Sequence, residues 1–499
     1  MRARTTRWES WEAYRRHESA TVDIPGGGDL PSALFFPDDY SVGMANLGYH
    51  YIFRGLREQG IAVERFFNTP IPYRSVDRDT LFERFSLILA SVSYEGSLPV
   101  LVKWLSEGGV SPLRTDRGEG SPLVGAGGAV TYINPLILTG VCDFILLGDG
   151  LPLLPFLAEA LRNGVSRRDT LRRLAEHPSI LVPQIHLESG HGLPPRAVNK
   201  EEDISRAYGY GNWITKKTAF GNTLLVELQR GCRLGCRYCT LPSCFSPFRQ
   251  RGVESVISDI RRAAARTRFE QVGLITPEAS DYRGLRDLLG ELESMDKGVS
   301  FASLRVDFLT QDIIRAMVRG GRHSITIAPE TGDDELRASC GKSFSNDTIL
   351  EALSAAKSEG VRKAKLYFMI GLPGESEEHV LAIAALCERI RRETELGLTI
   401  TVAPFVPKPG TAWQGAPFAG AAELKSKYAL LAKACKSVSR GVLQGVSIKE
   451  AELEYTLAWA TVSTAIRAAE GKSAKNLIGE ADPEDTREEM RKELRALGL

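Results

Sequence analysis

The sequence of 499 residues lacks long apolar runs and has almost no net charge, since 63 Lys and Arg residues are balanced by 62 Asp and Glu. A transmembrane helix needs about 20 consecutive apolar residues, so none is predicted. Residues Met1 to Tyr14 contain arginines but no apolar stretch, which argues against a signal peptide. A net charge of +1 argues against a protein that coats nucleic acid, although it leaves room for a structured RNA recognised locally. We therefore expect a cytoplasmic protein.

Cysteine is also scarce: the chain has eight, too few for a disulfide framework at this length. Three of them nevertheless lie within eight residues, which indicates a metal site. Four others are isolated and are expected to be small, buried, apolar side chains: Cys142, Cys340, Cys387 and Cys435.

The composition, 43% hydrophobic and 25% charged, is ordinary for a globular protein, and the length predicts two or three domains. In the first third of the chain, short apolar runs alternate with helix-like stretches, which predicts a parallel sheet covered on both faces. The strands expected there are 33–36, 62–67, 87–92, 123–125 and 144–147. Five such strands fit a doubly wound, flavodoxin-like α/β domain.

A second series of strand and helix patterns begins at Leu224. The strands expected in it are 224–228, 271–276, 300–304, 324–328, 365–370 and 398–404. Six βα units are too few to close an eight-stranded barrel, so they predict a partial (βα)6 TIM-like barrel that is open on one side.

These patterns divide the chain into five parts. We expect an N-terminal extension (1–30), an α/β domain (31–165), a connecting segment (166–215), a partial barrel (216–420) and a helical C-terminal region (421–499).

The clustered cysteines, Cys232, Cys236 and Cys239, follow the first strand of the predicted barrel with the spacing C-x3-C-x2-C. Thiolates are the usual ligands of iron–sulfur clusters, and three of them can hold three irons of a cubane while the fourth iron stays open. The alternative is a zinc site, because Cys244 lies five residues beyond Cys239. Zinc sites of this kind usually pair two C-x2-C units far apart in the sequence, and this chain has no such pair.

The cysteine motif resembles that of the radical S-adenosylmethionine superfamily. The resemblance implies a [4Fe–4S] cluster whose open iron binds the amino and carboxylate groups of S-adenosylmethionine and whose electron cleaves it to a 5′-deoxyadenosyl radical. It also implies an electron donor such as flavodoxin or ferredoxin. The superfamily has an aromatic residue just before the third cysteine, and Tyr238 occupies that place, with an expected contact to the adenine.

Further residues at the predicted strand ends are candidates for binding S-adenosylmethionine under the same resemblance. Thr276 lies where the superfamily often has a Gly-Gly-Glu-like motif, although the glycines are absent here. Arg305 is expected to pair with a carboxylate, with a purely structural arginine as the alternative. Residues 328–332 resemble the Glu/Ser-x-Gly element of the MiaB, NifB and coproporphyrinogen-dehydrogenase-like branch, so Glu330 is expected to face ribose hydroxyls and Arg337 the carboxylate of S-adenosylmethionine. Gly371 begins a Gly-Leu-Pro-Gly element whose strand end lies near the adenine in that branch.

Glycine-rich strand ends in the first domain resemble a cobalamin-binding-like domain. The residues expected to contact the cobalamin are Ser91, Ser93, Gly127, Gly128, Gly148 and Gly150. The usual Asp-x-His-x-x-Gly loop is missing, because residues 37–44 contain no histidine, and His50 lies later on a predicted helix. Two alternatives remain open: the cobalt lacks a lower histidine ligand, or the domain binds no cobalamin.

Three hypotheses follow for the function. The first is a radical S-adenosylmethionine enzyme that transfers a methyl group with the help of cobalamin. The second is a cobalamin-independent radical enzyme that catalyses RNA modification, sulfur insertion or a rearrangement. The third is a non-catalytic zinc or cluster scaffold. The sequence assigns neither the substrate nor a residue that reacts with it.

Overall fold

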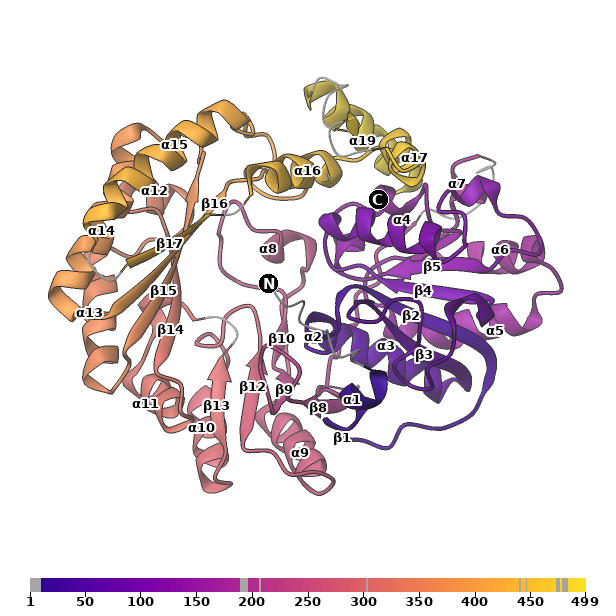
Figure 1. The fold of residues 1–499 in the computed structure, drawn as a ribbon, viewed down its shortest axis with the longest axis horizontal. Helices are drawn as coiled ribbons and strands as arrows, with labels where there is room; N and C mark the ends of the chain where they lie inside the picture. Colours follow the sequence, from indigo (N-terminus) through magenta and orange to yellow (C-terminus); the bar gives the residue numbers. More distant parts are fainter. Residues whose placement is uncertain are drawn as a thin grey trace, which may run out of the picture.

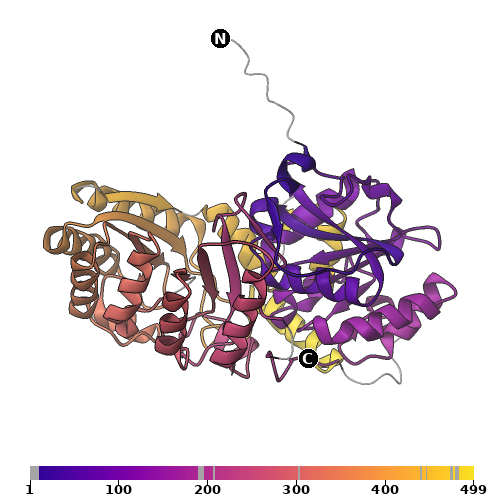
Figure 2. The same cartoon turned by 90° about the horizontal axis from the view of Figure 1, so that it is seen from below.

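The computed structural model describes residues 10–188, 196–205, 208–301, 304–438, 441–445, 447–472, 476–477 and 483–499. Two α/β units lie side by side, one built mainly from residues 29–181 and the other from residues 223–445 (Figure 1). The C-terminal helices return to the first unit, and the turned view shows the same arrangement (Figure 2). The predicted α/β architecture, a doubly wound domain followed by a partial barrel, is confirmed.

The first unit contains a six-stranded sheet with the order β3-β2-β4-β5-β6-β7. Its strands are Asp29–Asp39 (β2), Ile61–Thr69 (β3), Leu87–Ser91 (β4), Leu123–Gly127 (β5), Phe144–Leu146 (β6) and Ile180–Leu181 (β7). The strands from β2 to β6 are parallel, in the flavodoxin-like order, whereas β7 pairs antiparallel with β6. Because β7 belongs to this sheet, the first unit extends past the boundary expected at residue 165.

Helices cover both faces of this sheet. Side chains along β2 alternate between two hydrophobic cores: Phe35 packs in one core with α4 (Leu98–Glu107), whereas Leu34 packs in the other with α3 (Leu47–Glu58) and α5 (Leu154–Asn163). This alternation is the period-two pattern of a strand that is buried on both sides. Asn46 caps α3 by accepting a hydrogen bond from the Tyr49 amide, which fixes the start of the helix at the carboxyl end of β2.

The expected N-terminal extension is packed against the first unit from Ser10 onward. Trp11, on the short helix α1 (Trp11–Arg15), is almost completely buried in the core beside α3. Strand β1 (Glu18–Ala20) pairs antiparallel with β8 (Trp213–Thr215), which lies in the expected connecting segment. Residues 189–195 and 206–207 of that segment lie outside the described residues.

The second unit has seven parallel strands in the part of the chain that is described, one more than expected. They form one sheet of β9 (Thr223–Glu227), β12 (Gln271–Ile275) and β13 (Gly298–Phe301), and another of β14 (Ser324–Glu330), β15 (Lys363–Ile370), β16 (Gly397–Pro404) and β17 (Gly441–Gly445). Strand β17 corrects the expectation that residues 421–499 are helical throughout, because it pairs in parallel with β16. Residues 302 and 303, which include Ser303 after the third strand, lie outside the described residues.

Helices lie on the outer side of the second unit's strands (Figure 1). They are α9 (Val253–Ala264), α10 (Leu285–Ser294), α11 (Gln311–Arg319), α13 (Asn346–Ser358), α14 (Glu377–Thr394) and α15 (Ala421–Ala434). Since the connections are parallel crossovers, the carboxyl ends of all these strands meet at one edge, where barrel proteins build their sites.

The C-terminal helices α16 (Ile448–Ala458), α17 (Val462–Ala469) and α19 (Pro483–Leu497) contribute to the core of the first unit rather than to the barrel. Leu457, Trp459 and Met490 are buried in the same hydrophobic core as α4. The end of the chain thus completes the core on the α4 face of the first unit's sheet, whereas Trp11, near the start, packs in the core on the α3 face. Among the described helices, none combines the length and the apolar character needed to cross a bilayer.

Candidate functional site

The three clustered cysteines lie on a loop that is closed at its base by two short strands. Strand β10 (Gln229–Arg230) pairs antiparallel with β11 (Arg249–Gln250), so residues 231–248 form the cysteine loop between them. Gly231 begins the loop with φ +74°, and a Cβ atom there would lie 2.7 Å from the Phe245 carbonyl oxygen, so the closed base requires glycine. All three cysteines are half-buried.

The three thiols lie within electrostatic range of one another. Burial, together with the neighbouring Cys236 and Cys232, raises the pKa of Cys239 to about 11. Burial and Cys236 also raise the pKa of Cys232. A metal reverses this cost, because a coordinated thiol is deprotonated by the positive charge. The donor set therefore fits a thiolate-bound cluster, although no three His, Cys, Asp or Glu side chains in the described ranges converge closely enough for a single ion.

Cys244, the fourth ligand of the zinc alternative, contacts the loop after β16. Its Sγ atom lies 3.8 Å from the Pro409 carbonyl oxygen, and it packs against Gly410 in the loop after β16. Cys340 is completely buried, as are Cys142 and Cys387, in agreement with the apolar role expected for them.

Two distant segments hold the cysteine loop from outside. The Arg237 amide donates to the Cys340 carbonyl at 3.0 Å, and the Arg237 carbonyl accepts from the Trp413 amide at 3.0 Å. Gly341, with φ +88°, lies so close to the Gly235 carbonyl that a Cβ atom would collide with it. The sequence analysis did not predict these contacts to the cysteine loop. The sequence feature that could have indicated them was Gly341, which follows the C-cap of helix α12 (Asp334–Ser339).

A buried acidic group lies beside the cysteine loop. The Tyr238 hydroxyl donates to Glu330 Oε1 at 2.6 Å, and Lys342 Nζ donates to the same oxygen at 2.5 Å. The Glu330 and Lys342 side chains are each 7% exposed, so this is a buried ion pair. Glu330 ends β14 in a left-handed conformation with φ +67°, which is unusual outside glycine and is typical of functional sites. The structure thus brings together two of the expected residues, Tyr238 and Glu330, and adds Lys342.

Arg337 has a different role from the one expected. Its guanidinium has no exposed surface, and each of its five N–H groups has a protein acceptor. The acceptors are the carbonyls of Pro329, Thr331 and Phe344 and the side chains of Asp334 and Asn346. No donor is left for the carboxylate of S-adenosylmethionine, and Arg337 instead holds the turn that follows Glu330.

Thr276 follows β12, the strand next to the one that leads into the cysteine loop, and Arg305 follows β13. Arg305 makes a two-pronged ion pair with Asp307, at 2.9 and 2.7 Å, and the charges of Cys236 and Glu278 also contribute to the raised pKa of its guanidinium. The Thr276 hydroxyl is bonded to the backbone of Glu278, whose side chain is almost fully buried. Glu278 was missed as a candidate, although an acidic residue just after a barrel strand end was visible in the sequence.

Gly371 directly follows β15 with φ +81°, and its amide donates to Glu375 Oε2 at 2.7 Å. A Cβ atom at this position would lie 3.0 Å from Leu424 and 3.1 Å from Ala419, so Gly371 packs tightly against the segment that leads into α15. This packing explains the glycine without a ligand.

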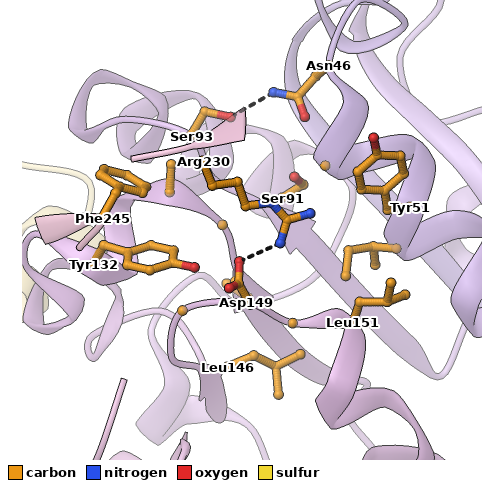
Figure 3. A pocket seen from close by; sticks show the side chains of 18 of the residues that line it. Asn46, Tyr51, Ser91, Ser93, Tyr132, Leu146, Asp149, Leu151, Arg230 and Phe245 are labelled. Atoms are coloured by element: carbon orange, nitrogen blue, oxygen red, sulfur yellow. Dashed lines mark hydrogen bonds and ion pairs between the residues drawn. The ribbon is translucent and has the colours of Figure 1, made fainter. Parts of the chain in front are cut away.

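A cavity of about 360 Å³ lies at the carboxyl edge of the first unit's sheet (Figure 3). All six residues expected to contact cobalamin line it: Ser91, Ser93, Gly127, Gly128, Gly148 and Gly150. Its deep wall consists of leucines from the core beneath α5: Leu34, Leu89, Leu146, Leu154 and Leu157. The Tyr51 hydroxyl, which also belongs to this wall, is buried and has no hydrogen-bond partner in the described structure. A buried hydroxyl without a partner costs about 1–3 kcal/mol, so a polar group in the cavity, from water or from a ligand, would stabilise it.

The opposite side of the same cavity belongs to the cysteine loop and its base. Glu227, Arg230, Gly231 and Phe245 line it from the barrel unit, and the Phe245 ring stacks on Tyr132 of the first unit at 4.4 Å. A ligand in this cavity would therefore touch both units next to the cysteines.

No histidine lines the cavity within the described residues. His50, on α3, is fully buried outside it, where Nε2 donates to the Met44 carbonyl and Nδ1 accepts from the Asn212 amide. Burial lowers its pKa to about 3. His50 is therefore a neutral structural residue. The leucine wall and glycine turns fit a flat cofactor with an apolar tail, but the described lining of the cavity offers it no histidine ligand.

Comparison with known proteins gives matches in both units. Residues 226–387 match the sequence profile of the radical SAM superfamily, and residues 59–183 match a profile described as radical SAM proteins, N-terminal. An uncharacterized protein of Methanocaldococcus jannaschii is 32% identical over 214 residues, which are 43% of this chain and 47% of that protein. The ribosomal protein uS12 methylthiotransferase RimO of Thermotoga maritima is 24% identical over 180 residues, which are 33% of this chain and 41% of that protein. The chain thus spans less than half the length of either relative.

A solved structure shares the complete two-unit fold. It is the radical S-adenosylmethionine methyltransferase TsrM from Kitasatospora setae with cobalamin and a [4Fe–4S] cluster bound, which covers 93% of this chain and 100% of its own with a TM-score of 0.58. At 13% sequence identity, this likeness shows the fold alone. The two profile matches cover more than half of the chain and include the cysteine loop, Tyr238 and Glu330. The chain therefore belongs to the radical SAM superfamily, a membership that implies a [4Fe–4S] cluster and S-adenosylmethionine.

Proposed function

We propose that this protein is a cytoplasmic radical enzyme in which Cys232, Cys236 and Cys239 hold a [4Fe–4S] cluster. When bound and reduced, for example by a flavodoxin or a ferredoxin, the cluster supplies the electron that cleaves S-adenosylmethionine to a 5′-deoxyadenosyl radical. The observation that carries this proposal is the cysteine loop itself, with three half-buried thiols at the carboxyl end of the first barrel strand and a buried Tyr238–Glu330–Lys342 group beside them.

Each residue around the loop is proposed to bind a different part of S-adenosylmethionine. Both bonds that Glu330 accepts are made to Oε1, so Oε2 remains available for a ribose hydroxyl. Arg305 lies near Cys236 and brings a guanidinium that suits a carboxylate. Glu278, on the same side, suits the ammonium group. Tyr238 and Gly371 remain the candidates for contact with the adenine, and Thr276 shapes the turn that carries Glu278.

The cavity between the two units supports a second part of the proposal, which is that cobalamin binds there without a histidine ligand. When bound as methylcobalamin, the cofactor supplies a methyl group for transfer to a substrate. Ser91 and Ser93 would face its polar groups, the glycines at 127, 128, 148 and 150 allow its close approach, and the leucine wall suits its apolar tail. The alternative is a cobalamin-independent reaction, such as RNA modification, sulfur insertion or rearrangement, with the substrate in this cavity.

The first experiment is anaerobic reconstitution with iron and sulfide, reduction, and measurement of 5′-deoxyadenosine formed from S-adenosylmethionine. We expect formation by the wild type and by Cys244→Ala, whose thiol lies on the same loop but faces Pro409, and none by Cys236→Ala. Tightly bound zinc with no cluster and no cleavage would overturn the proposal in favour of a scaffold.

Titration with hydroxocobalamin, followed by its visible spectrum, tests the second part. Ser91→Trp places a bulky ring at the cavity wall and should abolish binding, whereas Ser294→Trp, on the exposed face of α10, should not. Failure of the wild type to bind would favour the cobalamin-independent reaction.

A further inference from the structure

The base of the cysteine loop carries two arginines that face each other across its two strands. Arg230 on β10 and Arg249 on β11 are register partners, and they directly flank the loop of residues 231–248 in the neck that these two strands form. Arg249 also binds the end of the loop directly, since its Nε donates to the Pro247 carbonyl at 3.0 Å. The positions of these two arginines therefore set the geometry of the loop's neck.

One carboxylate of the first unit binds both arginines. Asp149 Oδ1 lies 3.0 Å from Arg230 Nη1, and Asp149 Oδ2 lies 3.1 Å from Arg249 Nη1 (the Arg230 pair is drawn in Figure 3). The Asp149 side chain is 10% exposed and that of Arg249 is 6% exposed, so solvent screens these contacts little. Each oxygen of Asp149 thus holds one end of the cysteine loop.

Asp149 is itself fixed within the first unit and its connecting segment. Its amide donates to the Asn199 carbonyl at 2.8 Å, and Asn199 Nδ2 donates back to the Asp149 carbonyl at 2.6 Å. The Glu201 amide adds a bond to Oδ2 at 2.8 Å. Gly148, before Asp149, has φ +84° and packs directly against Asn199, which leaves the turn little freedom. The carboxylate is therefore a rigid anchor.

We infer that Asp149 is a positioning residue for the iron–sulfur cluster, supplied by the first unit to the loop of the second. It acts through Arg230 and Arg249, which orient the neck and with it Cys232, two residues beyond Arg230. The inference rests on the proposed function, because it takes the loop to be the site of the cluster. It follows that the position of the cysteine loop in the second unit depends on contact with the first unit.

The test compares Asp149→Asn with a matched control, Asp143→Asn. Asp143 is also a buried carboxylate of the first unit that is paired with two arginines, Arg117 at 3.2 Å and Arg167 at 2.6 Å. It lies at the start of β6, the opposite edge of the sheet from the cysteine loop. Each full-length variant is reconstituted to measured iron content, reduced, and examined by electron paramagnetic resonance with and without S-adenosylmethionine and by redox titration.

We expect Asp149→Asn to change the resonance of the reduced cluster and its midpoint potential, and to slow 5′-deoxyadenosine formation by roughly 10–100-fold per cluster, as misplacement of a reacting group does. Asp143→Asn should leave the resonance unchanged at equal iron content. Asp149→Glu keeps the charge, has the adjoining cavity for its extra methylene, and should restore most of the wild-type resonance. Where Asp149→Asn does not fold, Arg249→Lys should shift the resonance in the same direction.

Identical resonance and rate for Asp149→Asn and Asp143→Asn would overturn the inference while leaving the proposed function intact. A wild type that takes up no cluster would instead overturn both, so the two failures are distinguishable.

Discussion

Glu330 combines two features that each cost free energy. Its carboxylate is buried, and its backbone is left-handed, at φ +67°, where side chains other than glycine are strained by about 1–3 kcal/mol. Lys342 and Tyr238 compensate the charge from two other segments of the chain. Such a residue is retained where its carboxylate has a use, and its place beside the cysteine loop indicates that use.

Replacing Lys342 by methionine should leave the Glu330 charge buried and unpaired. Loss of one partner of a buried ion pair costs about 3–5 kcal/mol, so we expect the free energy of unfolding in urea to fall by this amount. Lys103→Met is the matched control, because Lys103 pairs with Glu107 on the surface, where the two side chains are 73% and 54% exposed. The control should lose at most about 1 kcal/mol. Equal losses in the two variants would contradict the assignment of Glu330 and Lys342 as a buried pair.

His50 predicts a pH dependence of stability. Its pKa is about 3 in the folded protein, against about 6.5 when unfolded, because burial opposes the charged ring. Between pH 3 and pH 6.5 the imidazole of His50 is protonated in the unfolded state but not in the folded state. The free energy of unfolding is therefore highest above pH 6.5, and it decreases by about 1.4 kcal/mol per pH unit as the pH falls toward 3.

Urea unfolding at a series of pH values measures this effect. His50→Gln retains a donor and an acceptor but does not titrate, so its stability should fall less steeply with acid than that of the wild type. His323→Gln, at an exposed histidine, should follow the wild-type curve. Parallel curves for His50→Gln and the wild type would show that His50 is protonated in the folded protein.

At the scale of elements, helix α12 and the turn after it support the cysteine loop. We expect Gly341→Ala to displace that loop, because its Cβ atom would collide with the Gly235 carbonyl. Gly374→Ala is the control: its φ of +79° imposes similar backbone strain, but nothing lies within 4 Å of its added Cβ. Both variants should lose roughly 1–2 kcal/mol of stability from that strain. Only Gly341→Ala should also retain less iron per chain after reconstitution and desalting, and equal iron contents would contradict the supporting role of the turn.

The strands and helices that could be predicted from the sequence were those with a clear hydrophobic pattern within their own residues. Strands β2 to β6, β9 and β12 to β16 carry apolar runs that alternate with amphipathic helices. The five strands predicted in the first series and the six predicted in the second differ from the structure mainly at their ends. Strands β7 and β17 were missed because they have two and five residues and obtain their stability from pairing with β6 and β16. Tertiary pairing of this kind leaves no local periodicity.

The same distinction applies to the site. The cysteines, Tyr238 and Glu330 follow strand ends and could be recognised from their spacing. The role of Arg337 depends on how residues 329–346 fold around it, and that of Asp149 on two arginines 81 and 100 residues away. Lys342 and Gly341 were missed because their contacts with Glu330 and Gly235 also arise only in the folded chain.

At the scale of the whole molecule, Lys408 joins three regions. It follows β16 in the barrel, and its ammonium binds Glu95 of the first unit at 2.9 Å and Glu454 of α16 at 2.8 Å. Glu95 is almost fully buried, so solvent screens its ion pair with Lys408 little. The ion pair between Lys408 and Glu95 and the ion pairs of Asp149 with Arg230 and Arg249 all join the two units. Together they hold in place the walls of the cavity that lies between the units.

Lys408→Met should therefore loosen the junction of the units. We expect hydrogen exchange to become faster near Glu95, in the loop after β16 and in α16. Lys427→Met is the control, because Lys427 pairs with the fully buried Glu375 within the barrel unit alone. Its effect on exchange should stay within that unit, and the same confinement in Lys408→Met would contradict a joining role.

The contribution of the C-terminal helices to the core of the first unit has a consequence for synthesis. Domains generally fold as their segments leave the ribosome, the N-terminal one first. Here the first unit remains incomplete until Leu457, Trp459 and Met490 have been added, and these residues emerge after every cysteine of the cluster loop. A chain that stops early would leave apolar surface of the first unit uncovered, which chaperones and proteases recognise.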